Sequence, residues 1–166
     1  MRAYLNINVD TNQGIQATDW IKPETLLDLV HGNSAMRLMA PEPGAELPLK
    51  TFSRHKENIK IWYNHLNRYN LSEEEIKLLE KYLLPSYGLC IDQETIMRMS
   101  MDPNIGNFSV EQSNKLRKSI SKKDFNLLQK SKKEFYDCGN TAGASNNLLD
   151  YVWKEAFMLS AGYGLT

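Results

Sequence analysis

The 166-residue sequence has no excess of charge of either sign, because 20 Lys and Arg residues balance 20 Asp and Glu residues. A neutral chain has no overall attraction for nucleic acid or for an acidic membrane surface, so any anion must be bound by a local cluster of cations. The sequence also lacks an apolar run of about eighteen residues, the length that a membrane span needs, and a basic and then apolar leader. We therefore expect a cytoplasmic protein with no membrane partner.

Residues that form metal and nucleotide sites are also scarce. The two cysteines, Cys90 and Cys138, do not have the spacing of metal ligands, and Cys90 lies in an apolar run that predicts a core position. The three histidines, His31, His55 and His65, form no His-x-x-x-His pair, and no Gly-x-x-x-x-Gly-Lys-Ser loop is present. The sequence therefore predicts no metal site, no P-loop and no cofactor bound by this chain.

The residues that are present are typical of one globular domain. Hydrophobic residues make up 42% of the chain and charged residues 24%, and a chain of this length can bury about two thirds of its unfolded surface. Apolar residues recur at helical spacing along most of the sequence. We expect a mostly α single domain over residues 1–166 with about seven helices, and at most a short N-terminal strand where residues 3–9 alternate between apolar and polar.

Capping residues predict where the helices begin. Ser72 with Glu75, and Ser109 with Gln112, each have the spacing of a capping box, and Asp92 or a neighbour begins another helix. Between residues 38 and 53, several prolines predict a loop. We expect helices over residues 23–31, 55–69, 73–84, 93–101, 110–120, 122–138 and 149–162.

Apolar stripes predict which faces of these helices are buried. In the first helix, framed by Pro23 and Gly32, the side chains expected to be partly buried are Leu26, Leu27, Leu29 and Val30. The aromatic stripe that includes Trp62 predicts core packing rather than a base-stacking platform. The clearest stripe lies at the end of the chain and comprises Leu149, Val152, Trp153, Ala156 and Phe157.

The most distinctive stretch is 114–123, Asn-Lys-Leu-Arg-Lys-Ser-Ile-Ser-Lys-Lys, with five cations in nine residues. Its local field favours an anion, and phosphate is the natural candidate. On a helix, Leu116 and Ile120 share one apolar face, whereas Lys115 and Lys118 lie on another. The stretch therefore predicts a helix that is held by its apolar side and presents charge outward.

The end of this stretch also predicts an anion site at a helix start. Ser121 is an N-cap candidate, which would place Lys122 and Lys123 in the first turn of the next helix. Two cations in that turn are unfavourable because they oppose the helix dipole. An anion bound by the lysines and the free N–H groups would offset that cost. An ordinary solvated basic face is the alternative interpretation.

Four segments resemble one known family, and they occur in that family's order. Residues 116–123 resemble the Leu-Arg-Arg-Ala-Met-Gly-Lys-Lys element in the fingers of C-family bacterial replicative DNA polymerases, the polymerase III alpha subunits. Residues 87–97 are similar to Tyr-Gly-Val-x-Val-Tyr-Gln-Glu-Gln-Val-Met, and residues 161–164 to the start of Ala-Gly-Tyr-Gly-Phe-Asn-Lys-Ser-His. Residues 21–30 resemble Lys-Pro-Thr-x-Phe-Glu-Asp-Leu-Val, and Arg37 matches the Arg of Asn-Ala-Leu-Tyr-Arg.

The resemblance implies a fingers segment of a DNA-directed DNA polymerase, a fragment of a larger nucleotidyltransferase. Its partners would be the incoming dNTP, the primer–template DNA and the remaining polymerase domains. The family's Pro-Asp-x-Asp-x-Asp palm element is missing, since no two aspartates are separated by a single residue. We therefore expect no catalysis by this segment alone, and Mg²⁺ bound in the palm of the intact polymerase.

The same resemblance implies a set of phosphate-binding residues. Arg117 is the best candidate, because a guanidinium can bind a phosphate through two hydrogen bonds. Arg37 is a further candidate, for which an exposed surface arginine is the alternative. The other candidates are Lys118, Lys122 and Lys123, with Lys115, Gln93 and Glu94 as additional members; for Gln93 and Glu94, the ordinary start of a helix is the alternative.

The match departs from the family at several positions, since Lys118 replaces the second Arg of the basic element and Asp92 replaces the Tyr before Gln-Glu. We infer a divergent member, from a phage or mobile element. Two other hypotheses remain open. One is a stand-alone helical interaction protein that binds or regulates a replication partner, and the other is a DNA-binding helix-turn-helix over residues 110–138.

Overall fold

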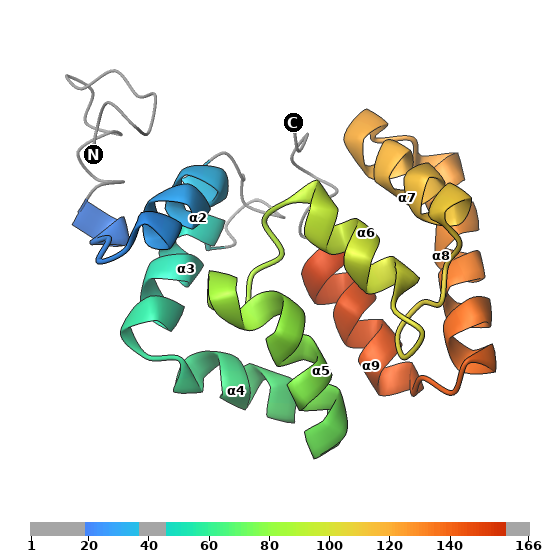
Figure 1. Ribbon diagram of the computed structural model, residues 1–166, viewed down its shortest axis with the longest axis horizontal. Helices are drawn as coiled ribbons and strands as arrows, with labels where there is room; N and C mark the ends of the chain where they lie inside the picture. Colours follow the sequence, from blue (N-terminus) through green and yellow to red (C-terminus); the bar gives the residue numbers. More distant parts are fainter. Residues whose placement is uncertain (1–18, 37–45, 159–166) are drawn as a thin grey trace.

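The expected α fold is confirmed for the part of the chain that the computed structural model describes, residues 19–36 and 46–158, in which no strand occurs (Figure 1). The strand expected over residues 3–9 and the helix end expected near 162 lie outside these ranges. The principal elements are α2 (Leu26–Met36), α3 (Pro48–Glu57), α4 (Lys60–Asn67), α5 (Glu73–Leu83), the 3₁₀ turn η1 (Leu84–Ser86), α6 (Gln93–Met101), α7 (Val110–Lys122), α8 (Phe125–Thr141), α9 (Asn146–Tyr151) and the π-helical η2 (Val152–Phe157).

The expected helix starts from α5 to α7 are confirmed. Ser72 caps α5 and Ser109 caps α7, and in both cases the side chain accepts a hydrogen bond from the backbone N–H three residues later, at 3.2 Å. Glu75 and Gln112 complete the boxes, because each accepts from the N–H of its capping serine at 2.9 Å. Asp92 caps α6 in the same way. These starts depend on contacts over three residues, which sequence spacing predicts well.

The bounds predicted for the first helix are wrong. Helix α2 does not begin at Pro23, because Thr25 forms the cap: Thr25 Oγ1 accepts from Asp28 N–H at 3.1 Å, and Asp28 Oδ2 accepts from Thr25 N–H at 3.2 Å. Gly32 does not end the helix but lies inside it. A Cβ on Gly32 would lie 2.8 Å from Cδ1 of Ile21, so this glycine serves close packing rather than chain reversal.

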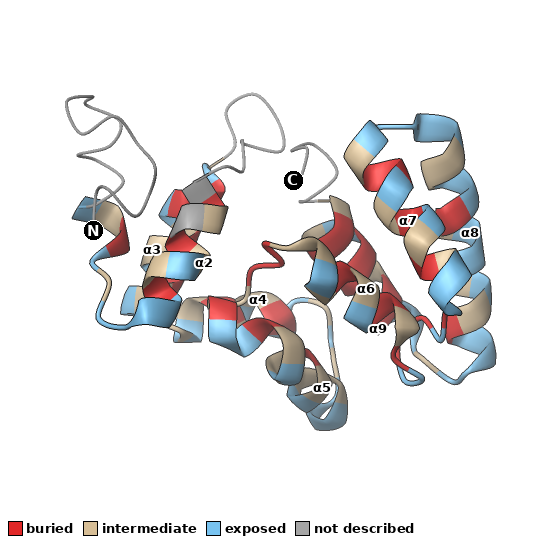
Figure 2. Cartoon of the chain, turned by 45° about the horizontal axis from the view of Figure 1, so that its top comes forward, coloured by how far each residue is buried: buried red, intermediate tan, exposed pale blue. Residues whose placement is uncertain are grey.

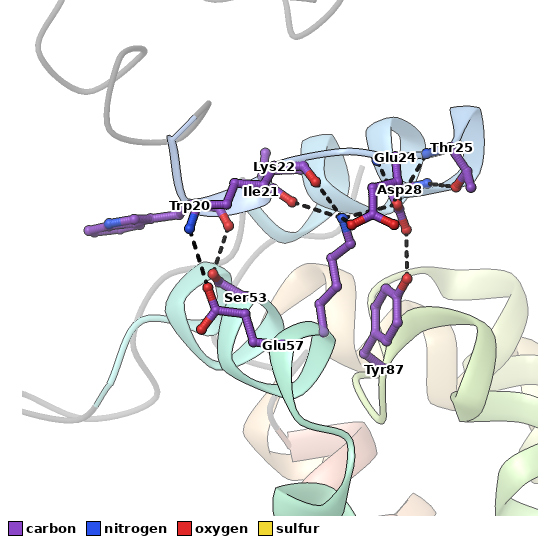
Figure 3. Close-up of polar contacts among 10 residues, drawn as sticks. Trp20, Ile21, Lys22, Glu24, Thr25, Asp28, Ser53, Glu57 and Tyr87 are labelled. Atoms are coloured by element: carbon purple, nitrogen blue, oxygen red, sulfur yellow. Dashed lines mark hydrogen bonds and ion pairs between the residues drawn. The ribbon is translucent and has the colours of Figure 1, made fainter.

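The predicted buried face of α2 is also wrong. Leu26 is 71% exposed, and Leu27 and Val30 are exposed as well, whereas Asp28 is only 4% exposed. Leu29 is partly buried, as expected. The inward position of the first turn is occupied by a carboxylate whose hydrogen-bonding capacity is filled by protein donors (Figure 3), and apolar periodicity alone cannot indicate such an arrangement.

The loop predicted over residues 38–53 extends too far, because α3 begins at Pro48. Proline suits the first turn of a helix, where the missing N–H would have no intrahelical partner. The single helix predicted over residues 55–69 is divided in two, since Asn58 is extended (φ −146°, ψ 93°) between α3 and α4. The fold therefore changes direction within a stretch whose apolar periodicity is continuous.

The junction between α7 and α8 differs from the predicted one. Lys122 ends α7, and Lys123 has a left-handed backbone (φ 54°). Asp124 N–H donates to Ser119 O at 3.1 Å and Lys123 N–H donates to Ile120 O at 3.2 Å, the hydrogen-bond pattern of a Schellman motif. Asp124 then caps α8. Neither lysine is in the first turn of a helix, so the predicted N-terminal anion site at Ser121 is wrong.

The left-handed Lys123 gives a test of this junction. Lys123→Gly is expected to raise the free energy of unfolding by about 0.5–1 kcal/mol, because glycine adopts positive φ without steric cost. The same change at Lys122, the last α7 residue, should lower it by up to about 1 kcal/mol. Urea unfolding of both variants measures the difference. A destabilised Lys123→Gly would contradict the Schellman geometry.

Two hydrophobic clusters hold the helices together. The main core draws on helices α4 to η2, whereas the N-terminal cluster joins residues before and within α2 and α3 to the segment that leads into α6. Buried faces of the helices turn toward one another in Figure 2. Apart from the face of α2, the predicted core positions are confirmed: Cys90, Trp62 and Leu116 are buried, as are Leu149, Val152, Trp153, Ala156 and Phe157.

Small polar residues bring α6 and α7 together. Ser100 and Ser113 are fully buried, and their hydroxyl oxygens lie 2.9 Å apart. Ser113 also lies 3.4 Å from the carbonyl oxygen of Met97. Small side chains let two helices approach closely, so the last turn of α6 packs against the first turn of α7.

Candidate functional site

The packing of α6 against α7 brings two candidate residues, Gln93 and Arg117, into direct contact although they are far apart in the sequence. Arg117 Nη1, on α7, donates a hydrogen bond to Oε1 of Gln93, the first residue of α6, at 3.2 Å. Nε2 of the same amide donates to Ser121 Oγ at 3.1 Å. The sequence predicts Ser121 only as a cap, although its position four residues after Arg117 places both on one helix face.

The Arg117 side chain is partly buried. Its Nε is enclosed and finds no acceptor among the described residues, which leaves the terminal Nη groups as the donors available to an anion. An enclosed donor without a partner costs about 1–3 kcal/mol of stability. The position therefore does not have the free mobility of a surface arginine.

The lysines of the basic stretch are exposed on α7 and just after its end. Lys118 and Lys122 are one turn apart and Lys123 follows, all three exposed. Lys115 is also exposed, and its Nζ lies 3.1 Å from Oε1 of Glu111 in the same helix. Like charges one turn apart repel one another and raise the local positive potential.

Two further candidates are Glu94 and Arg37. Glu94 is exposed next to Gln93, and Arg37 lies outside the described residues. Within the described ranges, no group of three His, Cys, Asp or Glu side chains could hold a metal ion, and none of the helices there could cross a membrane.

A family model described as the bacterial DNA polymerase III alpha subunit finger domain matches residues 7–143. The chain belongs to this family. The resemblance to this family is therefore confirmed, and three of the four segments, all but residues 161–164, lie within the matched range.

Curated relatives of this finger domain are much longer than the chain. The chain is 41% identical over 156 residues to "Probable DNA polymerase YorL" of Bacillus subtilis (strain 168) and to "DNA-directed DNA polymerase" of Bacillus phage SPbeta. Each alignment covers 94% of the chain and 12% of the relative. The chain is 32% identical over 118 residues to "DNA polymerase III subunit alpha" of Mycoplasma genitalium, covering 70% of the chain and 11% of that relative. The phage relative fits the expected phage or mobile-element character.

A buried ion-pair cluster connects two of the family-like segments of the finger domain (Figure 3). Asp28 Oδ1 accepts from the Tyr87 hydroxyl at 2.8 Å, and Asp28 Oδ2 lies 3.2 Å from Lys56 Nζ. Lys56 also donates to the carbonyl oxygen of Lys22 at 2.5 Å. The cluster holds α2 and α3 against the segment that leads to Gln93.

The electrostatics of this cluster favour an ionised aspartate. Burial alone would raise the pKa of Asp28, but hydrogen bonds from Glu24 N–H, the Tyr87 hydroxyl and Lys56 outweigh it and lower the pKa to about 2. Burial and the hydrogen bond to Asp28 raise the pKa of Tyr87 to about 12. The network is therefore fixed in one protonation state at neutral pH.

A cavity of about 350 Å³ lies among α3, α4, Gly88 and the last helical turns. His65 Nε2 and Glu155 Oε2 lie 3.2 Å apart at its edge, and the hydrogen bond with His65 lowers the pKa of Glu155 despite burial. Trp62 contributes to the wall and donates to the Tyr151 hydroxyl at 2.8 Å. None of the predicted site residues within the described ranges lines this cavity.

Proposed function

We propose that this finger domain positions the triphosphate of an incoming deoxynucleotide, and the neighbouring primer–template backbone, during DNA replication. In this proposal the chain is one segment of a longer DNA polymerase. The observation that supports it is the hydrogen bond from Arg117 to Gln93, on a helix that also presents the exposed Lys118 and Lys122. A guanidinium in a fixed position is suited to bind phosphate through two hydrogen bonds.

Positioning is a large part of catalysis in phosphoryl transfer. Cations that hold the phosphates in line with the attacking hydroxyl offset the charge that develops in the transition state. Arg117 would donate hydrogen bonds to phosphate oxygens, while Lys118, Lys122 and Lys123 would supply the positive field. The described carboxylates do not form a metal site, so we assign Mg²⁺ and its chemistry to the palm of the longer polymerase.

Charge reversal in the longer polymerase tests this role. Arg117→Glu is expected to lower kcat/KM for nucleotide at least tenfold, because one charge-assisted hydrogen bond contributes about 1.5–3 kcal/mol. Lys122→Glu should have a smaller effect of the same sign. Lys60→Glu, on the exposed part of α4, is the matched control. Steady-state incorporation of a single nucleotide measures all three, and unchanged KM and kcat in Arg117→Glu would refute the assignment.

A further inference from the structure

Gln93 has a fixed position relative to α7. It is the first residue of α6, directly after the capping Asp92, whose Oδ1 accepts from Thr95 N–H at 2.6 Å. The buried contact between Ser100 and Ser113 holds the same two helices together. The backbone that carries the Gln93 side chain is therefore held in place twice, by the helix cap at Asp92 and by the packing of α6 against α7.

The amide is oriented at both of its ends. A guanidinium only donates hydrogen bonds, so it requires Oε1 rather than the NH₂ group of Gln93 to face Arg117. The Nε2 end donates to Ser121 Oγ at 3.1 Å, one turn beyond Arg117 on the same helix. A rotated amide would place its NH₂ group against the guanidinium, donor against donor, which disfavours that orientation; the Ser121 hydroxyl can donate or accept and contacts the amide in either case.

We propose that Gln93 is a positioning residue that holds the Arg117 guanidinium ready for an anion, and that Ser121 holds the Gln93 amide in place. This proposal rests on the phosphate-binding role proposed above for Arg117. A free arginine side chain loses about 2 kcal/mol of rotamer entropy when it is fixed. Fixing Arg117 before the anion arrives reduces that loss at the moment of binding.

The neutral amide explains why glutamine suits this position. A carboxylate would hold Arg117 at least as firmly, but it would neutralise the charge that attracts phosphate. An amide orients the guanidinium and leaves its charge intact. Gln93→Glu should therefore keep Arg117 ordered and still weaken anion binding, a combination that a purely structural role does not predict.

The experiment measures Arg117 order and anion affinity separately in the ¹⁵N-labelled 166-residue chain. NMR relaxation of the Arg117 Nε–H group reports side-chain order, and calorimetry with inorganic tripolyphosphate reports affinity. Gln93→Met should lower the order parameter and weaken binding about three- to tenfold, and Ser121→Ala should do the same to a smaller degree. Gln93→Glu should preserve order and weaken binding at least tenfold. Gln129→Met on the exposed face of α8 is the matched control, and circular dichroism verifies the helical fold of each variant.

The two readouts separate this proposal from the phosphate-binding role. If Arg117 keeps its order in Gln93→Met, the positioning role is overturned whatever happens to affinity. If order falls in Gln93→Met while Arg117→Ala binds tripolyphosphate as well as the wild type, Gln93 still holds Arg117, and only the phosphate role fails. Equal weakening by Gln129→Met and Gln93→Met would also overturn the proposal.

Discussion

Asp28→Asn is expected to lower the free energy of unfolding by about 3 kcal/mol, because it leaves Lys56, whose side chain is only 11% exposed, without its closest carboxylate. The asparagine oxygen can still accept a hydrogen bond, but the amide NH₂ then faces either the Tyr87 hydroxyl or the donors of the helix start. This buried network joins α2 and α3 to the segment before α6, so the loss affects the N-terminal half as a unit.

A matched control separates this effect from that of surface charge. Glu24 lies 4.0 Å from the same Lys56 but has an exposed side chain, and Glu24→Gln should change the free energy of unfolding by no more than about 0.5 kcal/mol. Tyr87→Phe removes one hydrogen bond to the carboxylate and should cost about 1–2 kcal/mol. Urea unfolding at neutral pH ranks the three variants. Equal effects of Asp28→Asn and Glu24→Gln would show that the network does not support the fold.

The contribution of Asp28 should depend on pH in a defined direction. Its folded-state pKa of about 2 lies below the usual 3.8, so the unfolded chain binds more protons in this range as the pH falls. The stabilisation is therefore fully present above about pH 5 and is lost as the pH falls toward 2. The difference between the wild type and Asp28→Asn should shrink by about 2 kcal/mol across that window.

Phe135→Ala is expected to lower the free energy of unfolding by about 3–5 kcal/mol. Phe135 is fully buried, and its ring contacts those of Phe108, Trp153 and Phe157 at centroid distances of 5.2–5.9 Å. It therefore links α8 to η2 and to the segment before α7. An alanine leaves a cavity that close packing cannot fill without moving several aromatic rings.

The same helix contains its own control. Phe125, at the start of α8, is 68% exposed, so Phe125→Ala removes the same atoms from a surface position and should change the free energy of unfolding by less than about 0.5 kcal/mol. Thermal or urea unfolding of both variants gives the comparison. Similar losses for the two phenylalanines would mean that the aromatic cluster is not the centre of the main core.

The sequence alone determined the elements that depend on near neighbours. The capping boxes at Ser72 and Ser109 and the stripe from Leu149 to Phe157 are confirmed, because capping and helical periodicity act over three or four residues. The family that the ordered segments indicated is confirmed as well. These local signals were sufficient for the fold class and the family.

Only the tertiary structure decided the features that depend on distant partners. Asp28 is buried because Lys56 and Tyr87 reach it from other parts of the chain, and periodicity had assigned that face of α2 to leucines. Gln93 meets Arg117 because two buried serines let α6 and α7 approach. The energy of a side chain depends on the groups that surround it, and a single sequence shows those groups only where they are near neighbours in the chain.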